Sequence, residues 1–362
     1  MKKKYLVLLG LLLSLALALS GCAAGLTASS WPALATDAKN AYLAGGPYVY
    51  AINLQTGAQA WRFPASASAA NPFYATPVLT PDGTHLIVGG FDKKLYSLDV
   101  QTGLSNWQFT DAHDRYYGGV LVVNDMIYAP NADYNLYALS LKGQLQWTFP
   151  ADQSIWGAPV SDGANVYFGT LGRKVYAVDA RTGKQVWMQV LDGAILGSPI
   201  VLKGKNDLFV GTYGGTLYAL STTDGKTLWS KPVSSWIWAG PVLDGTNLYV
   251  GDANGKFVAY SASAGAKVWK ADLSLNGAII GSPCLCDGKI VVGTEAGTVY
   301  FIDPTGKILQ TIPLSTNMKV YATPAAAGIL TLVAPTGGAS TDPVLLALDA
   351  AGATKWSFIP PK

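Results

Sequence analysis

The chain has 362 residues, of which 50% are hydrophobic and 13% charged, with 40 glycines, 19 tyrosines and 11 tryptophans but a single glutamate. This composition is poor in helix formers and rich in strand and turn formers, which excludes coiled coils, helical bundles and extensive disorder and favours an all-β fold. The net charge is +3, but Lys2, Lys3 and Lys4 belong to a segment that we expect to be removed, and the neutral remainder has no basic run for nucleic acid.

Residues 1–21 have the pattern of an export signal. Lys2 to Lys4 form the charged start, Tyr5 to Ala18 form an apolar stretch, and small residues then precede Cys22. The segment Leu19-Ser20-Gly21-Cys22 resembles the bacterial lipobox, in which the cysteine is lipidated after cleavage before it. The alternative is an ordinary signal peptide with a chance cysteine.

The lipobox resemblance implies that Cys22 is a lipid attachment site and that residues 22–30 are a tether. Two or more acyl chains hold a protein durably on a membrane surface. Because Ala23 rather than an aspartate follows the cysteine, similarity to sorted lipoproteins favours the periplasmic side of the outer membrane in a host with two membranes. In a host with one membrane, the anchor would lie on the outer face of the cytoplasmic membrane.

From residue 31 onward the sequence repeats eight times. Each copy contains a glycine that is followed four residues later by a tryptophan, except in the seventh copy, where Gln310 replaces the tryptophan. The pairs, spaced by 40 to 46 residues, are Gly57/Trp61, Gly103/Trp107, Gly143/Trp147, Gly183/Trp187, Gly225/Trp229, Gly265/Trp269, Gly306/Gln310 and Gly352/Trp356.

Each repeat is predicted to form four antiparallel strands. In the fourth copy, Pro159 begins the first strand, Asp162-Gly163 makes a tight turn to the second, and Thr182-Gly183 joins the third to the fourth. Four such strands per roughly 40 residues are typical of a propeller blade. Residues 31–362 are therefore predicted to form one eight-bladed β-propeller, closed by the packing of the first blade against the eighth.

The tryptophans of the repeat are interpreted as structural contacts between blades. Their large flat side chains can pack on the next blade, and burial of each contributes about 2 to 3 kcal/mol. The alternative is a chain of ligand-binding aromatic residues. The inter-blade set is Trp61, Trp107, Trp147, Trp187, Trp229, Trp269 and Trp356.

A second aromatic series precedes the first strand of the blades. Aligning the repeats gives one column, three residues before the proline position: Tyr74, Tyr117, Trp156, Leu196, Trp238, Ile280 and Tyr321. Connections between blades meet around one mouth of the channel of a propeller, so we expect this column to form a ring there. Exposed aromatic residues suit a peptide or an extended strand, which makes Tyr74, Tyr117, Trp156, Trp238 and Tyr321 the candidate partner-binding residues. The alternative is that they plug the channel or pack between blades.

The remaining cysteines and the histidines form no recognisable metal pattern. Cys284 and Cys286 lie two residues apart, so they share one face of a strand, and both a disulfide and two packed thiols remain open. His85 and His113 are the whole histidine supply, and no serine, histidine and aspartate arrangement is visible. No metal site is predicted.

The pattern Ala-x-Asp-x-x-Thr-Gly-x-x-x-Trp, seen from Ala177 to Trp187, resembles the tryptophan-docking motif of quinoprotein-type, PQQ-binding-like propellers. Combined with the lipobox, it is similar to the BamB-like lipoproteins of outer-membrane protein assembly. This resemblance implies a membrane-anchored, non-catalytic scaffold whose partner is a protein, in a β-barrel assembly complex.

Quinoprotein dehydrogenases share the blade motif but bind pyrroloquinoline quinone (PQQ). They use an adjacent cysteine pair and a calcium site with glutamate, whereas here Leu285 separates the cysteines and Glu295 is predicted to lie in a turn between strands. No cofactor, and no PQQ in particular, is therefore expected, and the chain is predicted not to be an enzyme. The alternatives are a quinoprotein-type cofactor-binding enzyme and a cell-surface propeller that binds a glycan or another ligand.

Overall fold

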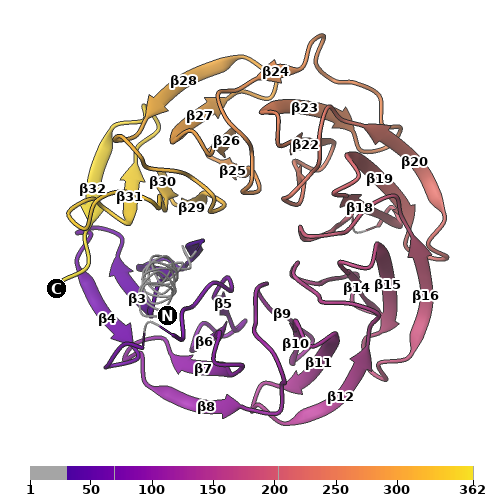
Figure 1. Cartoon of the computed structure of the whole chain (residues 1–362), viewed down its shortest axis with the longest axis horizontal. Coiled ribbons are helices and arrows are strands. Elements are labelled where there is room, and N and C mark those ends of the chain that lie inside the picture. The colour runs from indigo at the N-terminus through magenta and orange to yellow at the C-terminus, as the bar shows by residue number, and fades with distance from the viewer. Residues whose placement is uncertain (1–30, 69, 203, 362) are drawn as a thin grey trace, which may run out of the picture.

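The computed structural model describes residues 31–68, 70–202 and 204–361, and these residues form eight sheets of four antiparallel strands. The sheets are arranged as blades around a central axis, with the first strands, such as β5, β9, β25 and β29, innermost and the fourth strands along the rim (Figure 1). This confirms the predicted eight-bladed β-propeller. The described residues include no helix long and apolar enough to cross a membrane. The predicted signal peptide, Cys22 and the tether lie outside the described residues.

Each blade takes its four strands from consecutive stretches of the chain. Blades 1 to 4 are made of β1 (Ala33–Thr36), β2 (Asn40–Gly45), β3 (Tyr48–Asn53), β4 (Gln59–Phe63), β5 (Val78–Leu79), β6 (His85–Gly89), β7 (Leu95–Asp99), β8 (Ser105–Phe109), β9 (Leu121–Val123), β10 (Met126–Pro130), β11 (Asn135–Ser140), β12 (Leu145–Pro150), β13 (Val160–Ser161), β14 (Asn165–Gly169), β15 (Lys174–Asp179) and β16 (Gln185–Val190). Blades 5 to 8 are made of β17 (Ile200–Leu202), β18 (Asp207–Gly211), β19 (Thr216–Ser221), β20 (Thr227–Pro232), β21 (Val242–Leu243), β22 (Asn247–Gly251), β23 (Lys256–Ser261), β24 (Leu273–Ser274), β25 (Cys284–Cys286), β26 (Lys289–Gly293), β27 (Thr298–Ile302), β28 (Ile308–Pro313), β29 (Ala325–Ala327), β30 (Leu330–Val333), β31 (Leu345–Leu348) and β32 (Thr354–Phe358).

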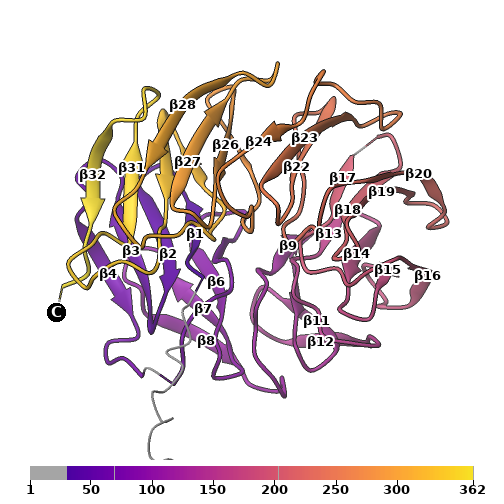
Figure 2. The ribbon, with the colours of Figure 1, turned by 45° about the horizontal axis from the view of Figure 1, so that its top comes forward.

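The second and third strands of each blade form the core. In blade 4, Val166, Tyr167 and Phe168 of β14 are fully buried, and so are Val175 and Ala177 of β15. Both faces of these strands pack against neighbouring blades (Figure 2), so their sequences are apolar at every position instead of alternating. The fourth strands alternate, because one of their faces meets solvent.

The turn between the third and fourth strands is fixed by aspartate and glycine. In blade 4 the Asp179 Oδ1 accepts hydrogen bonds from the Thr182 amide at 2.7 Å and the Thr182 hydroxyl at 2.7 Å. Gly183 follows at a φ of 68°, in the left-handed region that glycine occupies without strain. Asp99 and Thr102 make the same contacts in blade 2.

The repeat tryptophans dock on the following blade. The Trp187 Nε1 donates a hydrogen bond to the Thr222 carbonyl of blade 5 at 2.7 Å, and the indole lies against Gly225, where an added Cβ would meet Trp187 Cε3 at 2.6 Å. The equivalent bonds join Trp61 to Val100, Trp107 to Leu141, Trp147 to Ala180, Trp229 to Ala262, Trp269 to Pro304 and Trp356 to Leu54. In blade 7 the Gln310 Nε2 donates to the Ala350 carbonyl at 3.2 Å, so the glutamine keeps the hydrogen bond but not the indole surface.

The ring closes by packing. The Trp356 Nε1 donates to the Leu54 carbonyl at 2.7 Å and its indole covers Gly57, so blade 8 docks on blade 1 as every other blade does on its successor. The Thr36 hydroxyl adds a hydrogen bond to the Ala326 carbonyl at 3.0 Å, and apolar residues of both blades form one buried cluster. Blade 1 thus packs against blade 8 as predicted, and because the four strands of each of these blades are consecutive, the ring closes without strand exchange.

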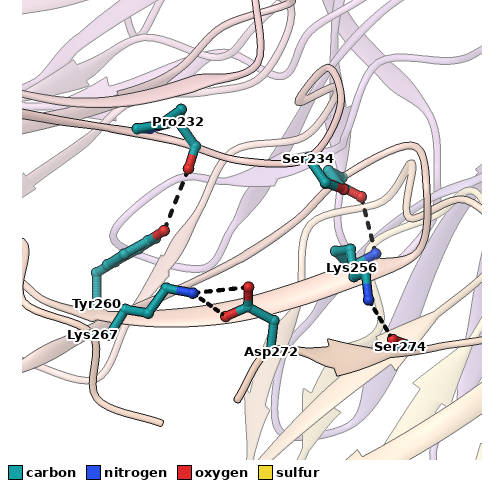
Figure 3. Close-up of polar contacts among 8 residues, drawn as sticks. Pro232, Ser234, Lys256, Tyr260, Lys267, Asp272 and Ser274 are labelled. Atoms are coloured by element: carbon teal, nitrogen blue, oxygen red, sulfur yellow. Dashed lines mark hydrogen bonds and ion pairs between the residues drawn. The ribbon is translucent and has the colours of Figure 1, made fainter. Parts of the chain in front are cut away.

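Blade 6 departs from the regular pattern at its fourth strand. The strand is reduced to β24, and the chain protrudes outward from the rim before it (Figure 1). The Lys267 Nζ pairs with the Asp272 carboxylate at 2.8 Å across this bend, and the Lys256 Nζ donates to the Ser274 hydroxyl at 2.6 Å (Figure 3). These contacts replace part of the missing backbone pairing, and Trp269 keeps its bond to the next blade.

The two cysteines of blade 7 form a disulfide bond, Cys284–Cys286, with a Cα–Cα distance of 5.9 Å. Cys286 is buried in the apolar cluster shared by blades 7 and 8, together with Val320 and Val333. Of the two states left open by the sequence, the structure has the disulfide.

Candidate functional site: the aromatic channel mouth

The candidate aromatic residues lie on loops that a buried neighbour holds in place. Ile237, one residue before Trp238, is 1% exposed and covers Gly211 at the end of β18. An added Cβ at Gly211 would lie 2.6 Å from Ile237 Cγ2, and the Ile237 amide donates to the Thr212 carbonyl at 3.0 Å. The same arrangement recurs with Tyr116 on Gly89, Ile195 on Gly169, Ile279 on Gly251 and Val320 on Gly293, and it fixes the position of these connections between blades.

These connections enter the innermost strands, so their residues surround one mouth of the channel (Figure 1). The turns between the second and third strands of the blades lie on the same face as these connections. The Tyr213 amide, in such a turn, donates to the Ala194 carbonyl at 2.8 Å, and the Ala253 amide donates to the Trp236 carbonyl at 3.1 Å. Loops and turns therefore form one hydrogen-bonded layer, which presents the aromatic side chains from a rigid base.

Tyr74, Tyr117 and Trp156 come together in blades 2 to 4. The Tyr117 and Trp156 rings stack with centroids 4.6 Å apart, and Phe91 lies 4.9 Å from Tyr117 and 4.2 Å from Tyr74. The Arg115 guanidinium covers the Phe91 ring at 5.1 Å. All four aromatic side chains are partly buried. We call Tyr74, Phe91, Tyr117 and Trp156 the first aromatic group.

Trp238 and Tyr321 belong to a second set, which Trp31 joins. The Trp31 ring lies 5.1 Å from Trp238 and 5.8 Å from Tyr321, and Trp236 lies 5.8 Å from Trp238 and 4.7 Å from Tyr213. Trp31 thus bridges the entrances of blades 1, 6 and 8. We call Trp31, Tyr213, Trp236, Trp238 and Tyr321 the second aromatic group.

Instead of the single ring that the column suggested, the candidate residues therefore lie in two groups. Leu196, the column residue of blade 5, lies between Trp156 and Trp238 in the series. Its aliphatic side chain interrupts the row of aromatic rings. The column did not include Phe91 and Tyr213, which come from turns and not from the loops. Trp31 and Trp236 stood out in the sequence as tryptophans outside the repeat position.

A charged pair borders the second aromatic group. The Lys319 Nζ lies 3.0 Å from Glu295 Oε1, and the Tyr321 hydroxyl donates to the same oxygen at 3.0 Å. These two hydrogen bonds hold the pKa of Glu295 below its usual value, while partial burial raises the pKa of Tyr321. Glu295 lies in the turn between β26 and β27, as predicted, and its carboxylate stays ionised beside the aromatic rings at neutral pH.

The loop Asp111–Arg115, the densest charge group of the sequence, is tied into the same face. The Asp133 carboxylate accepts a hydrogen bond from the His113 amide at 2.7 Å, and the Asn131 side-chain amide donates to the Asp114 carbonyl at 2.9 Å. These contacts support the first aromatic group, because Arg115 covers Phe91.

The mouth presents flat apolar rings beside the Glu295–Lys319 ion pair. Among the residues that the structure describes, no three His, Cys, Asp or Glu side chains converge to hold a metal ion. Glu295, the residue that resemblance to quinoproteins would bring forward as a calcium ligand, is engaged by Lys319 and Tyr321. These side chains do not fit the donor set of a quinone–calcium site, and we derive no step through such a cofactor.

An eight-bladed propeller whose blades are locked by tryptophans defines the class of quinoprotein-type propellers. Within this class the chain belongs to the family described as outer membrane protein assembly factor BamB, which matches residues 20–154, 133–235, 204–276 and 259–359.

Solved structures share the fold. BamB from Moraxella catarrhalis superposes with a TM-score of 0.68 at 19% identity, covering 89% of this chain and 92% of that one. The computationally designed Ika8 protein superposes with a TM-score of 0.74 at 16% identity, and the superposition covers 91% of this chain and 96% of the designed one. A lanthanide-dependent methanol dehydrogenase from Methylacidiphilum fumariolicum (strain SolV) is 36% identical over 66 residues, which are 18% of this chain and 11% of the enzyme. The match therefore spans about a tenth of the enzyme's length.

Proposed function

We propose that this chain is a membrane-anchored, non-catalytic scaffold that binds a protein partner through the two aromatic groups, as part of outer-membrane β-barrel assembly. Family membership supports the role in the cell envelope. The observation that carries the binding site is the gathering of Trp156, Trp238 and their neighbours at one mouth of the ring. Tryptophan and tyrosine dominate the binding energy of protein interfaces, and these side chains stand on a hydrogen-bonded base.

The proposed anchor keeps this mouth near a membrane. Trp31, the first described residue, lies in the second aromatic group, nine positions after Cys22. A fully extended tether of this length spans about 30 Å. With a lipidated Cys22, the aromatic groups would stay within that distance of the bilayer, on the periplasmic side of an outer membrane or on the outer face of a cytoplasmic membrane.

The proposal is tested with the double variant Trp156→Ala/Trp238→Ala, which removes one ring from each aromatic group. The variant should remain folded, yet the amount of envelope protein recovered with it in a mild-detergent pull-down from native membranes should fall about tenfold or more. Leu104→Ala is the control, because Leu104 is an exposed apolar residue of the turn between β7 and β8, at the opposite end of the strands from the channel mouth. Equal recovery with wild type, the double variant and the control would contradict the proposal.

One observation favours a quinoprotein function as the second candidate, namely the similarity to the methanol dehydrogenase over 66 residues. A titration with PQQ and calcium or a lanthanide, followed by absorbance, distinguishes the two: saturable binding with dye reduction by an alcohol would support the enzyme. A third candidate, a cell-surface propeller, would be supported by saturable binding on a glycan array.

A further inference from the structure

The outer strand of blade 4 presents an apolar stripe at the rim of the ring. In β16 the exposed side chains are Val186, Met188 and Val190, which are 49%, 39% and 48% exposed. They alternate with Trp187, which docks on blade 5. β16 is also the edge strand of its sheet, so its outward backbone groups have no partner strand within the blade. An apolar edge of this kind is a template for pairing with another strand.

The equivalent strands of the other blades carry protection against such pairing. The residue after the repeat tryptophan, or after Gln310, is polar or charged in seven of the eight copies, which read Arg62, Gln108, Thr148, Ser230, Lys270, Thr311 and Ser357, against Met188 in blade 4. Two positions further on, four copies have a proline, which has no amide to donate: Pro64, Pro150, Pro232 and Pro313, against Val190. Blade 6 breaks its edge by the bend that the Lys267–Asp272 pair holds (Figure 3).

We propose that β16 pairs with β16 of a second copy of this chain, antiparallel about a two-fold axis at Met188. This register sets Met188 opposite Met188 of the second copy, and Val186 opposite Val190 in both directions. All cross-strand pairs on the exposed face are then apolar, whereas a shift by one residue would set Val186 opposite Gln189.

Charge also favours a second copy over an unrelated strand. No charged residue occurs from Gln185 to Val190, and the nearest charges beyond the two ends are Lys184 and Asp192, of opposite sign. The two-fold axis therefore places charges of opposite sign at the two flanks, although both Asp192 carboxylate oxygens already accept hydrogen bonds, at 2.6 Å, from the Thr212 and Thr216 hydroxyls.

The geometry of the rim permits this pairing between copies on one membrane. The outer strands run along the circumference of the ring (Figure 1), so a two-fold axis parallel to the ring axis joins two propellers side by side with the same face on the same side. Two six-residue strands bury less than the roughly 1,200 Å² of a stable interface, so we expect a dissociation constant in the micromolar range. Anchoring on a common surface would raise the effective concentration.

The register is tested by cross-linking through Met188→Cys. Opposite residues of an antiparallel pair have Cα atoms about 4.5 to 5.5 Å apart, a separation that a disulfide spans. In the full-length chain under mild oxidation, Met188→Cys should yield a covalent homodimer. Thr148→Cys, at the same position of β12, is the matched control and should yield none above the wild-type background, which also accounts for any cross-link through Cys22.

Two further variants test the association in sedimentation experiments from about 1 to 500 µM. Met188→Lys sets two lysines opposite each other and should weaken dimerisation roughly tenfold or more. Val190→Pro introduces the residue that blades 3 and 5 tolerate at this position and should have the same effect in a folded chain, as judged by an unchanged melting temperature. A wild-type chain that stays monomeric throughout this range, or a Met188→Cys chain that cross-links no better than Thr148→Cys or only to a different polypeptide, would overturn the proposal. None of these outcomes depends on the aromatic groups, so the dimer proposal can fail while the proposed scaffold function stands, and the reverse also holds.

Discussion

At the scale of single residues, the repeat depends on the pairing of a tryptophan with a glycine in the next blade. Gly225 has a φ of 73°, and an added Cβ there would lie 2.6 Å from Trp187 Cε3, so glycine satisfies both the turn and the indole. The indole also satisfies the Thr222 carbonyl. Blade 7 separates the hydrogen bond from the packing of the indole. Gln310 retains the hydrogen bond to the next blade, while Ile312, instead of an indole, occupies the space above Gly352.

We predict that Trp187→Ala lowers the free energy of unfolding by about 3 to 5 kcal/mol, because it removes a buried aromatic side chain and leaves a cavity between blades. Gln310→Ala should cost about 1 kcal/mol, since it removes mainly one hydrogen bond. Chemical denaturation of both variants measures the two values. An equal loss in the two variants would show that the indole surface contributes little.

The aspartates of the turns predict a dependence of stability on acid. Hydrogen bonds from Thr102 and Thr182 hold the pKa values of Asp99 and Asp179 below their usual 3.8. A lowered pKa in the folded state means that the stabilisation is present above the unfolded value and is lost as pH falls through the folded value. The melting temperature should therefore fall as pH decreases below 3.8.

The variant Asp99→Asn/Asp179→Asn tests this assignment. Its amides keep an oxygen for the turn but do not titrate in this range, so its melting temperature should fall less steeply with acid than that of the wild type. Parallel thermal melts between about pH 6 and pH 2 provide the comparison. The same steepness in both proteins would assign the acid sensitivity to other carboxylates.

At the scale of elements, five of the loops between blades take their position from a glycine at the end of a second strand, namely Gly89, Gly169, Gly211, Gly251 and Gly293. Ile237 packs over Gly211, and Trp236 and Trp238 flank Ile237 in the chain. The shape of the second aromatic group therefore depends on a contact that involves none of its own rings. Gly169 with Ile195 repeats the arrangement one blade earlier.

Gly211→Ala should destabilise the fold by about 1 to 3 kcal/mol, because the added Cβ forces Ile237 to move. Ile237→Ala should cost about 2 to 5 kcal/mol through the cavity that it leaves. Because the new methyl group occupies part of that cavity, the double variant should lose less than the sum of the two single losses. Strict additivity in denaturant titrations would mean that this contact does not position the loop.

At the scale of the whole molecule, the repeat predicted the architecture because each Gly–Trp pair carries its own turn and its own contact with the next blade. The sequence therefore specified eight blades and predicted that blade 1 packs against blade 8, but it did not show which strand completes the ring. Three features could not be predicted. Phe91 and Tyr213 occupy the same turn position of their blades, but this position holds Ala132, Leu171, Ala253 and Glu295 elsewhere, so it has no aromatic pattern. Trp31 reaches the entrance of blade 6 through a contact between residues distant in the sequence. The bend before β24 also replaces a regular strand, although the Gly265/Trp269 pair has the same spacing as in the other repeats.

The column predicted which aromatic residues lie at the mouth of the channel but not how their rings contact one another. It comprised Tyr74, Tyr117, Trp156, Trp238 and Tyr321, because alignment of the repeats places the loops at one mouth of the channel. Whether the rings form one circle or two groups depends on side-chain packing around Leu196 and Ile280, to which a repeat pattern is insensitive. The partner-binding role of these residues stays a prediction.

The most direct test of the scaffold account is site-specific photocross-linking in the native host. A photoreactive phenylalanine derivative would replace Tyr117 in the first aromatic group, and mass spectrometry would identify the adducts. The control position is Leu104, an exposed residue of the turn between β7 and β8 at the opposite end of the strands. The account predicts an adduct with an integral outer-membrane protein of the β-barrel assembly complex at position 117 and little or none at position 104. A folded, membrane-anchored protein that yields no protein adduct at position 117, or the same adducts at both positions, would contradict it.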